Sequence, residues 1–185
     1  MKVLISGSTG FIGGHLFRAL EQLGHTVVPI YNEKLLSLPY LEGVISEVKP
    51  DYIFHLATYG NMYNHKDIKK ILEANIIKTY NFLQASQKTS YRAFINFSTS
   101  SVLLPTQTNY SKSKKASELI AELFPNTVSI RPSTVIGIGE RTEHLIPKLI
   151  RSCLHQEEMS FVAEPTHDFI SPVIRPCDEA QFGFL

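Results

Sequence analysis

Short apolar runs alternate with longer amphipathic segments along most of the chain. Runs rich in β-branched and aromatic residues predict strands at 3–6, 26–31, 52–56, 93–98 and 127–131. Apolar residues at helical spacing predict helices at 11–23, 38–48, 67–87, 110–124 and 145–154. Strands joined by helical crossovers pair in parallel, because each crossover returns the chain to the same end of the sheet. The pattern therefore predicts an α/β fold, a doubly wound parallel sheet with helices on both faces.

The first predicted strand leads directly into a glycine turn. Gly7, Gly10 and Gly13 are spaced three apart where that strand ends and the first helix begins. Such a turn directs unpaired backbone N–H groups and the positive end of the helix dipole at one point, which suits a pyrophosphate. The spacing GxxGxxG differs from the GxGxxG dinucleotide fingerprint, and a glycine turn of another α/β protein is the alternative. A Walker A loop is excluded because no Gly-Lys-Ser/Thr follows.

Composition narrows the class of protein. The 185 residues are 43% hydrophobic and 19% charged with a formal net charge of +1, as in one ordinary soluble globular domain. We expect no nucleic-acid partner, because there is no basic stripe, and no membrane span or signal peptide. The two cysteines, Cys153 and Cys177, form no CxxC motif and indicate a reduced, cytoplasmic protein. The seven histidines are scattered, so no metal site is expected.

A second chemical signal lies near the middle of the chain. Tyr110 and Lys114 are four residues apart on a predicted helix, so both side chains share one face, where the ammonium would lower the phenol pKa. Alone, such a pair is usually a solvated polar face. Four hydroxyl residues, 98–101, end the preceding buried strand, at the sheet edge where doubly wound proteins bind ligands. Turn formation and helix capping are the alternative for that cluster, but together with the glycine turn it favours catalysis.

These features resemble the extended short-chain dehydrogenase/reductases, in particular nucleotide-sugar epimerases, dehydratases and 4-ketoreductases, which have a Rossmann-like fold. The resemblance covers residues 2 to about 171, through the glycine turn and the segments 55–57, 72–76, 98–99, 110–114, 130–132 and 168–170. It implies that Tyr110 is the acid/base and that Lys114 lowers its pKa and holds the ribose. Thr99, or Ser100 as the alternative, would bond the reacting oxygen.

The same resemblance implies a seat for NAD or NADP and a nucleotide-sugar substrate. The implied cofactor-binding residues are Gly7, Thr9, Gly10, Phe11, Ile12, Gly13, Asn32, Leu56, Ala57, Thr58, Asn75, Tyr110, Lys114, Pro132 and Ser133. The choice between the two cofactors stays open, because Asn32 would bond a hydroxyl, Glu33 would favour NAD and Lys34 would favour NADP. The family also implies a homodimer through the helices 67–87 and 110–124, burying Ile71, Ile77, Tyr80, Ile120 and Phe124. The alternative is that these side chains pack within the monomer.

The chain departs from the family in three places. Leu103 and Leu104 stand where the family motif has Tyr-Gly, so a tyrosine that often lines the sugar pocket is missing. The stretch 31–51 is short for this family. It lacks the strand that family members have there, with its adenine-contacting aspartate. We expect an NAD(P)-binding domain at 1–171 and an atypical tail at 172–185, with most of the substrate lobe absent. Two functions follow: an NAD(P)-dependent enzyme acting on a nucleotide-sugar, or a dinucleotide-binding remnant or sensor without turnover.

Overall fold

A computed structural model describes residues 1–62 and 64–155, which form parts of two compact units. The first unit is 1–144 and the second begins at Leu145. Of the second unit the structure describes one helix, α6 (Leu145–His155), none of whose residues is buried. The predicted domain boundary at 171, the tail 172–185, Cys177 and the family segment 168–170 lie outside the described residues.

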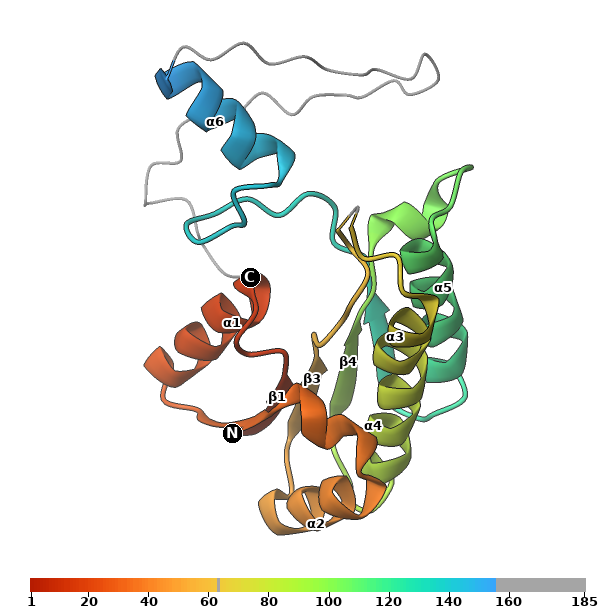
Figure 1. The fold of residues 1–185 in the computed structure, drawn as a ribbon. Coiled ribbons are helices and arrows are strands. Elements are labelled where there is room, and N and C mark those ends of the chain that lie inside the picture. Colours follow the sequence, from red (N-terminus) through yellow and green to blue (C-terminus); the bar gives the residue numbers. More distant parts are fainter. Residues whose placement is uncertain (63, 156–185) are drawn as a thin grey trace. The chain divides into compact units, whose positions relative to one another are not determined.

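A five-stranded parallel sheet forms the centre of the first unit (Figure 1). Its strands are β1 (Lys2–Ser6), β2 (Thr26–Ile30), β3 (Tyr52–His55), β4 (Ala93–Phe97) and β5 (Thr127–Ile130), in the order β2-β1-β3-β4-β5. The chain runs from β1 outward to β2 and then returns to the other side of β1, so strand order reverses between β1 and β3. Doubly wound folds bind ligands at such a reversal, beyond the carboxyl ends of the strands.

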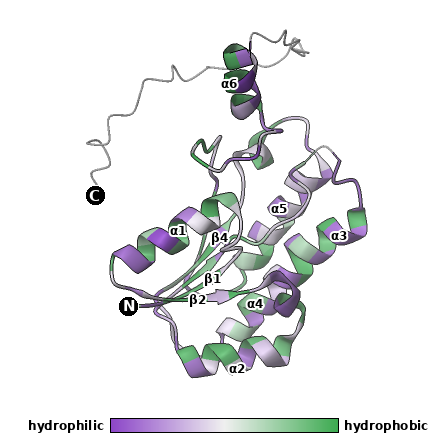
Figure 2. Cartoon of the chain, turned by 60° about the vertical axis from the view of Figure 1, so that its left-hand side comes forward, coloured by the Kyte–Doolittle hydropathy of each residue, from purple (hydrophilic) through white to green (hydrophobic). Residues whose placement is uncertain are grey.

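Helices cover both faces of the sheet, which confirms the predicted fold class. α1 (Phe11–Gln22) lies on one face, and α2 (Leu38–Val48), α4 (Lys78–Ser86) and α5 (Asn109–Ala121) lie on the other (Figure 1). Figure 2 shows hydrophobic and hydrophilic residues mixed along these helices, as expected for helices packed on a sheet. Two short 3₁₀ segments, η1 (Asn32–Leu36) and η3 (Ser100–Leu103), follow β2 and β4.

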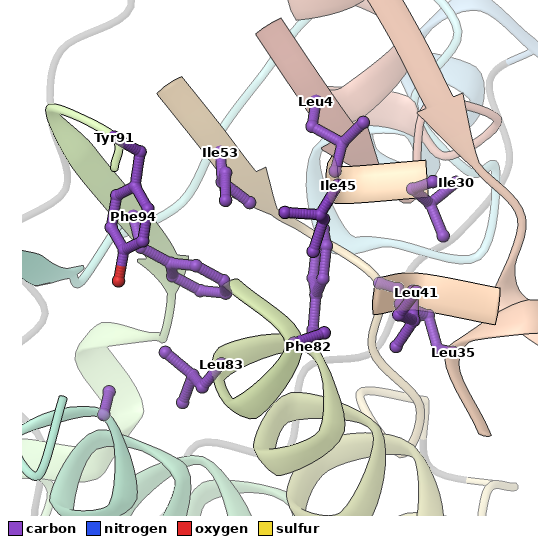
Figure 3. Packing of buried hydrophobic residues seen from close by; sticks show 13 residues of the cluster. Leu4, Ile30, Leu35, Leu41, Ile45, Ile53, Phe82, Leu83, Tyr91 and Phe94 are labelled. Atoms are coloured by element: carbon purple, nitrogen blue, oxygen red, sulfur yellow. The ribbon is translucent and has the colours of Figure 1, made fainter. Parts of the chain in front are cut away.

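The main core lies between the sheet and the α2–α4–α5 layer. Leu4, Ile53 and Phe94, from three adjacent strands, face Phe82 and Leu83 of α4, and all five are completely buried (Figure 3). The rings of Phe82 and Phe94 meet edge to face at 5.3 Å between centroids. Burying five such side chains contributes roughly 1.5–3 kcal/mol each, which fixes α4 on the sheet.

The predicted helix 67–87 is continuous but not uniform. It consists of α3 (Ile68–Leu72), a π-helical turn η2 (Glu73–Ile77) and α4. The stretch between β2 and β3 holds only η1 and α2, which confirms the expected lack of a third strand there.

The residues proposed for a dimer face divide between surface and core. Ile77 and Tyr80 are 48% and 45% exposed, whereas Ile71 is only 2% exposed. Ile120 and Phe124 are partly buried against the main core. The expectation that Ile71 would be buried by a partner is therefore wrong, because this side chain already packs inside the subunit.

Candidate active site

A cavity of about 700 Å³ opens at the carboxyl ends of the strands. A volume of this size is typical of small-molecule and cofactor sites. The predicted site residues that line it are Gly7, Thr9, Gly10, Phe11, Ile12, Gly13, Asn32, Leu56, Ala57, Thr58, Thr99, Tyr110, Pro132 and Ser133. The predicted residues Asn75, Ser100 and Lys114 are not among its lining residues. The fold thus brings together most of a set that is spread over five strand ends.

The glycine turn is built by close approach of backbones. Gly7 has φ +78°, and a Cβ there would lie 2.6 Å from the Ala57 amide nitrogen, so both its conformation and its surroundings require glycine. A Cβ at Gly13 would collide with the carbonyl oxygen of Gly7. These two glycines allow β1, β3 and the start of α1 to converge at the cavity.

The N-terminus of α1 fits a pyrophosphate. Its N-cap is Gly10, no side chain caps it, and its first turn contains no acidic residue. Its first amides belong to Phe11, Ile12 and Gly13, all of which line the cavity, and the first helical bond that follows is from Gly14 to Gly10. Uncapped N–H groups at the positive end of a helix dipole form a site for an anion.

Tyr110 and Thr99 reach the same cavity from adjacent elements. Tyr110 lies in the first turn of α5, which Thr108 caps by accepting a hydrogen bond from the Ser111 amide at 3.2 Å. Thr99 caps η3 immediately after β4, and its hydroxyl lies 3.1 Å from that of Ser101. Of the two alternatives for the oxygen-binding role, only Thr99 lines the cavity.

The phenol of Tyr110 is held in its neutral form. Burial raises the pKa of Tyr110, and a hydrogen bond with the Thr58 hydroxyl opposes this to a smaller extent. The expected lowering of this pKa by Lys114 is not found, because removal of the phenol from water has the largest effect on it.

Lys114 is buried one helical turn beyond Tyr110. Burial lowers the pKa of its ammonium to about 8, although the nearby Glu118 carboxylate favours the charged form. Glu118 in turn receives two hydrogen bonds of 2.8 Å from the guanidinium of Arg131, which holds the pKa of that carboxyl down at about 2. This bidentate pair ties α5 to the end of β5.

Asn75 acts as a buried connector rather than as a cavity wall. Its side-chain oxygen accepts hydrogen bonds from the Thr58 hydroxyl at 2.8 Å and the Tyr59 amide at 3.0 Å. Its amide nitrogen donates to the Tyr59 carbonyl at 2.7 Å and to the Ser113 hydroxyl at 2.8 Å. With all four bonds made, Asn75 fixes the loop after β3 against the helix that carries Tyr110 and Lys114.

A buried histidine links the ends of β1 and β3. Thr79 donates its single hydroxyl proton to the Asn75 carbonyl at 2.9 Å, so His55 Nε2 must be the donor in its 3.0 Å bond to Thr79. Burial lowers the pKa of His55 to about 3, which leaves Nδ1 unprotonated to accept from the Ser6 hydroxyl at 2.6 Å. The Ser6 oxygen then accepts from the Ala57 amide at 3.4 Å. The neutral His55 ring with its proton on Nε2 is therefore the tautomer that satisfies all of these hydrogen bonds.

The sequence model of the NAD dependent epimerase/dehydratase family matches residues 3–171. The chain belongs to this family. Two curated relatives agree: GDP-6-deoxy-D-talose 4-dehydrogenase from Aggregatibacter actinomycetemcomitans is 28% identical over 92% of the chain, and CDP-abequose synthase from Salmonella typhimurium is 30% identical over 91%. The chain spans 66% and 65% of the length of these two relatives.

Solved structures show the same fold. UDP-glucuronic acid 4-epimerase from Bacillus cereus in complex with NAD is 25% identical, with a TM-score of 0.71. The match covers 85% of this chain and 63% of the epimerase.

Several lining residues of this epimerase/dehydratase chain were not predicted from sequence. They are Asn61, Phe97, Ser98, Ser101, Thr108, Thr134, Val135, Glu140, Arg141 and His144. Ser98 and Ser101 belong to the hydroxyl cluster that drew attention to Thr99, but the loop after β5 carries no comparable motif. In that loop, Glu140 Oε1 lies 3.1 Å from His144 Nδ1, while Glu140 Oε2 is buried without a partner among the described residues.

The structure also bears on metal sites, membrane-spanning helices and free cysteines. Within 1–62 and 64–155, no group of three or more histidine, cysteine or acidic side chains is placed to hold a metal ion. Over the same residues, no helix has the length and apolar character needed to span a membrane. Cys153 is a free, exposed thiol.

Proposed function

We propose that the chain binds NAD or NADP and takes part in hydride transfer to or from a sugar carbon of a nucleotide-sugar. The observation that carries this proposal is the opening of Tyr110 and Thr99 into the same cavity as the uncapped N-terminus of α1. A dinucleotide with its pyrophosphate at that helix end would extend toward the strand ends that hold both hydroxyls. The two relatives named above act on nucleotide-linked sugars by name, which supports the substrate class.

Each catalytic group has a separate role in this proposal. Bound nicotinamide supplies hydride transfer. Tyr110 gives its phenolic proton to the sugar oxygen during reduction and takes a proton back during oxidation. Thr99 donates a hydrogen bond to the same oxygen and orients it. Lys114 holds the cofactor ribose and stabilises the phenolate that forms at Tyr110 after proton donation.

The raised pKa of Tyr110 suits the reducing direction. A neutral phenol is the form that donates a proton, and burial keeps this form in place before the reaction. Lys114 lies one turn away with its own pKa lowered to about 8, so most of its population stays charged at neutral pH. The pair is therefore arranged for proton donation to a ketone.

Titration of the 185-residue chain with NADH and NADPH, followed by addition of a 4-keto nucleotide-sugar, tests the proposal. We expect saturable binding of at least one cofactor and oxidation of that cofactor when the sugar is present. Failure to bind either cofactor would overturn the proposal.

A second function is dinucleotide binding without turnover. It needs only the glycine turn and the uncapped N-terminus of α1, both of which line the cavity. A dinucleotide-binding module without turnover would bind NADH or NADPH in the same titration but would leave it unoxidised by any 4-keto nucleotide-sugar.

We also propose a homodimer in the cytoplasm. Ile77 and Tyr80 are exposed apolar side chains on the helical segment Glu73–Ser86, and Leu119 and Leu123 are exposed on or just after α5. The rings of Tyr80 and Phe124 lie 6.3 Å apart, so these two helices present one adjoining surface. A copy of the same surface would cover it by two-fold symmetry. Light scattering that gives the mass of a single chain at high concentration would contradict this dimer.

A further inference from the structure

Only one residue of the segment 31–36, which follows β2, lines the cavity. Asn32 begins η1 and lines the cavity, whereas Glu33 and Lys34 do not. The Lys34 ammonium instead lies 5.4 Å from the centre of the Tyr40 ring. In doubly wound folds the residue at this position meets the adenosine ribose, where NAD and NADP differ by a 2′-phosphate. Neither charged neighbour that the sequence offered for this choice faces the cavity.

Asn32 is oriented by a buried lysine. Lys78, the first residue of α4, donates from Nζ to the Asn32 side-chain oxygen at 3.3 Å. An ammonium group has hydrogens but no acceptor, so the amide must turn its oxygen toward Lys78 and its nitrogen away. Among residues 1–62 and 64–155 the structure gives the Asn32 amide nitrogen no acceptor. Asn32 therefore has two N–H donors left for a ligand.

The positive charge behind Asn32 is only partly neutralised. Lys78 Nζ lies 3.5 Å from Glu73 Oε1, and the Lys78 side chain is 7% exposed while that of Glu73 is 41% exposed. The more exposed carboxylate is better screened by water, so the lysine has the stronger effect on the neighbouring cavity wall.

We infer that Asn32 and Lys78 make the chain select NADP(H) over NAD(H). This inference rests on the proposed function and assigns its cofactor. A free 2′-hydroxyl is best recognised by a carboxylate, which accepts a hydrogen bond from it, and no carboxylate lines this part of the cavity. A 2′-phosphate accepts hydrogen bonds from N–H donors and is attracted by a nearby cation. Both requirements are met by the Asn32 amide and the Lys78 ammonium.

Fluorescence titration with NADPH and NADH tests the inference on the 185-residue chain. We expect NADPH to bind at least about tenfold more tightly than NADH, as charge-assisted hydrogen bonds to a phosphate imply, with a smaller ratio at high salt. Lys78→Met should bring the ratio close to one by weakening NADPH binding alone. Lys34→Met, which removes an exposed lysine outside the cavity, is the matched control and should leave the ratio unchanged.

Asn32→Asp keeps the test valid if Lys78→Met does not fold. Asn32 is exposed, so the fold should tolerate this change, and the new carboxylate should repel the 2′-phosphate and accept from a 2′-hydroxyl. We expect NADH to become the preferred cofactor. Equal binding of both cofactors, or tighter binding of NADH by the wild-type chain, would overturn the inference while leaving the proposed function intact. Absence of binding to either would instead overturn the proposed function.

Discussion

Two walls of the cavity are built in different ways. The first wall, Gly7–Gly13 with Leu56 and Ala57, brings backbone against backbone, and a Cβ at Gly7 would lie 2.6 Å from the Ala57 nitrogen. The second wall, residues 132–135 with Glu140, Arg141 and His144, belongs to the loop that follows β5. Backbone contacts leave no room for substitution, whereas loop residues outside such contacts can be exchanged. Under the proposed function, the first wall would hold the dinucleotide and the second wall the sugar substrate.

The largest effect is expected from a methyl group in the first wall. In Gly13→Ala the new Cβ would collide with the Gly7 carbonyl oxygen, so the start of α1 must move away from β1. We expect a loss of roughly 3 kcal/mol in the free energy of unfolding, at the upper end for overpacking, measured by urea denaturation. Dinucleotide binding should be lost as well.

The matched control for this change is Gly43→Ala in α2. No atom lies within 4 Å of a Cβ at Gly43, and the position is helical. Alanine should stabilise the chain there by about 0.5–1 kcal/mol, because it restricts the unfolded backbone more than glycine does. Equal effects at the two positions would show that the first wall is not closely packed.

The next largest effect is expected on turnover, from a change at Tyr110. Tyr110→Phe removes only the phenolic oxygen, so turnover of a 4-keto nucleotide-sugar should fall by at least about 100-fold, as for loss of a general acid. The Kd for the dinucleotide should change little. Wild-type turnover in this variant would exclude Tyr110 as the proton donor.

The pH dependence of the reducing reaction gives a second measurement of the same group. Proton donation needs the neutral phenol, so activity should be lost as pH rises through the pKa of Tyr110. Burial raises that pKa, so this loss should come at a higher pH than in a free tyrosine, after the partial fall near pH 8 that loss of the Lys114 charge would give. Complete loss of activity below pH 8 with stable protein would contradict this assignment.

A smaller effect is expected behind the first wall, at His55. Asparagine places its amide near the position of Nδ1 and can still accept from Ser6, whereas glutamine reaches toward Thr79 and leaves the Ser6 hydroxyl without its acceptor. An unsatisfied buried hydroxyl costs about 1–3 kcal/mol. We therefore expect His55→Gln to weaken dinucleotide binding about tenfold, and His55→Asn by about threefold or less.

Equal losses in the two His55 variants would mean that the ring acts only by filling space between Phe82 and Phe94. His25→Gln is the control, because His25 precedes β2, at the amino ends of the strands and away from the cavity. It should leave dinucleotide binding unchanged. Nitrogen NMR of the wild-type chain should find the proton of the neutral His55 ring on Nε2.

Sequence reasoning succeeded for the first wall because local motifs specify it. Gly13 is required by a contact within the same turn, with the Gly7 carbonyl oxygen, and Gly7 by its φ of +78°, so the spacing of these glycines indicates the turn, although not the approach of Ala57 to Gly7. The parallel sheet with helices on both faces and the lack of a strand within 31–51 were likewise predicted, since both follow from the alternation of strand and helix patterns along the chain.

The parts that were missed depend on contacts between distant residues. Lys78 meets Asn32 across 46 positions, and Met62 lies 3.3 Å from His144 across 82 positions. No periodicity or spacing in the sequence indicates such pairs. Ile71 was placed on the surface for a similar reason, because the side chains that cover it come from other elements. The direction of the Tyr110 pKa also depended on burial, which the Tyr-Lys spacing alone does not reveal.

The smallest effect is expected in the second wall, at Glu140. Glutamine has the same shape and keeps an oxygen for His144, while it replaces the unpartnered Oε2 by an amide. If the dinucleotide lies at the first wall as proposed, Glu140→Gln should change its Kd by less than about twofold and stability by about 0.5 kcal/mol at most. Any change should appear instead in the KM for the nucleotide-sugar, whose hydroxyl groups would lose the carboxylate as an acceptor. Glu143→Gln, in the same loop but not lining the cavity, is the matched control and should change neither constant. A loss of dinucleotide binding in Glu140→Gln but not in Glu143→Gln would show that both walls hold the cofactor.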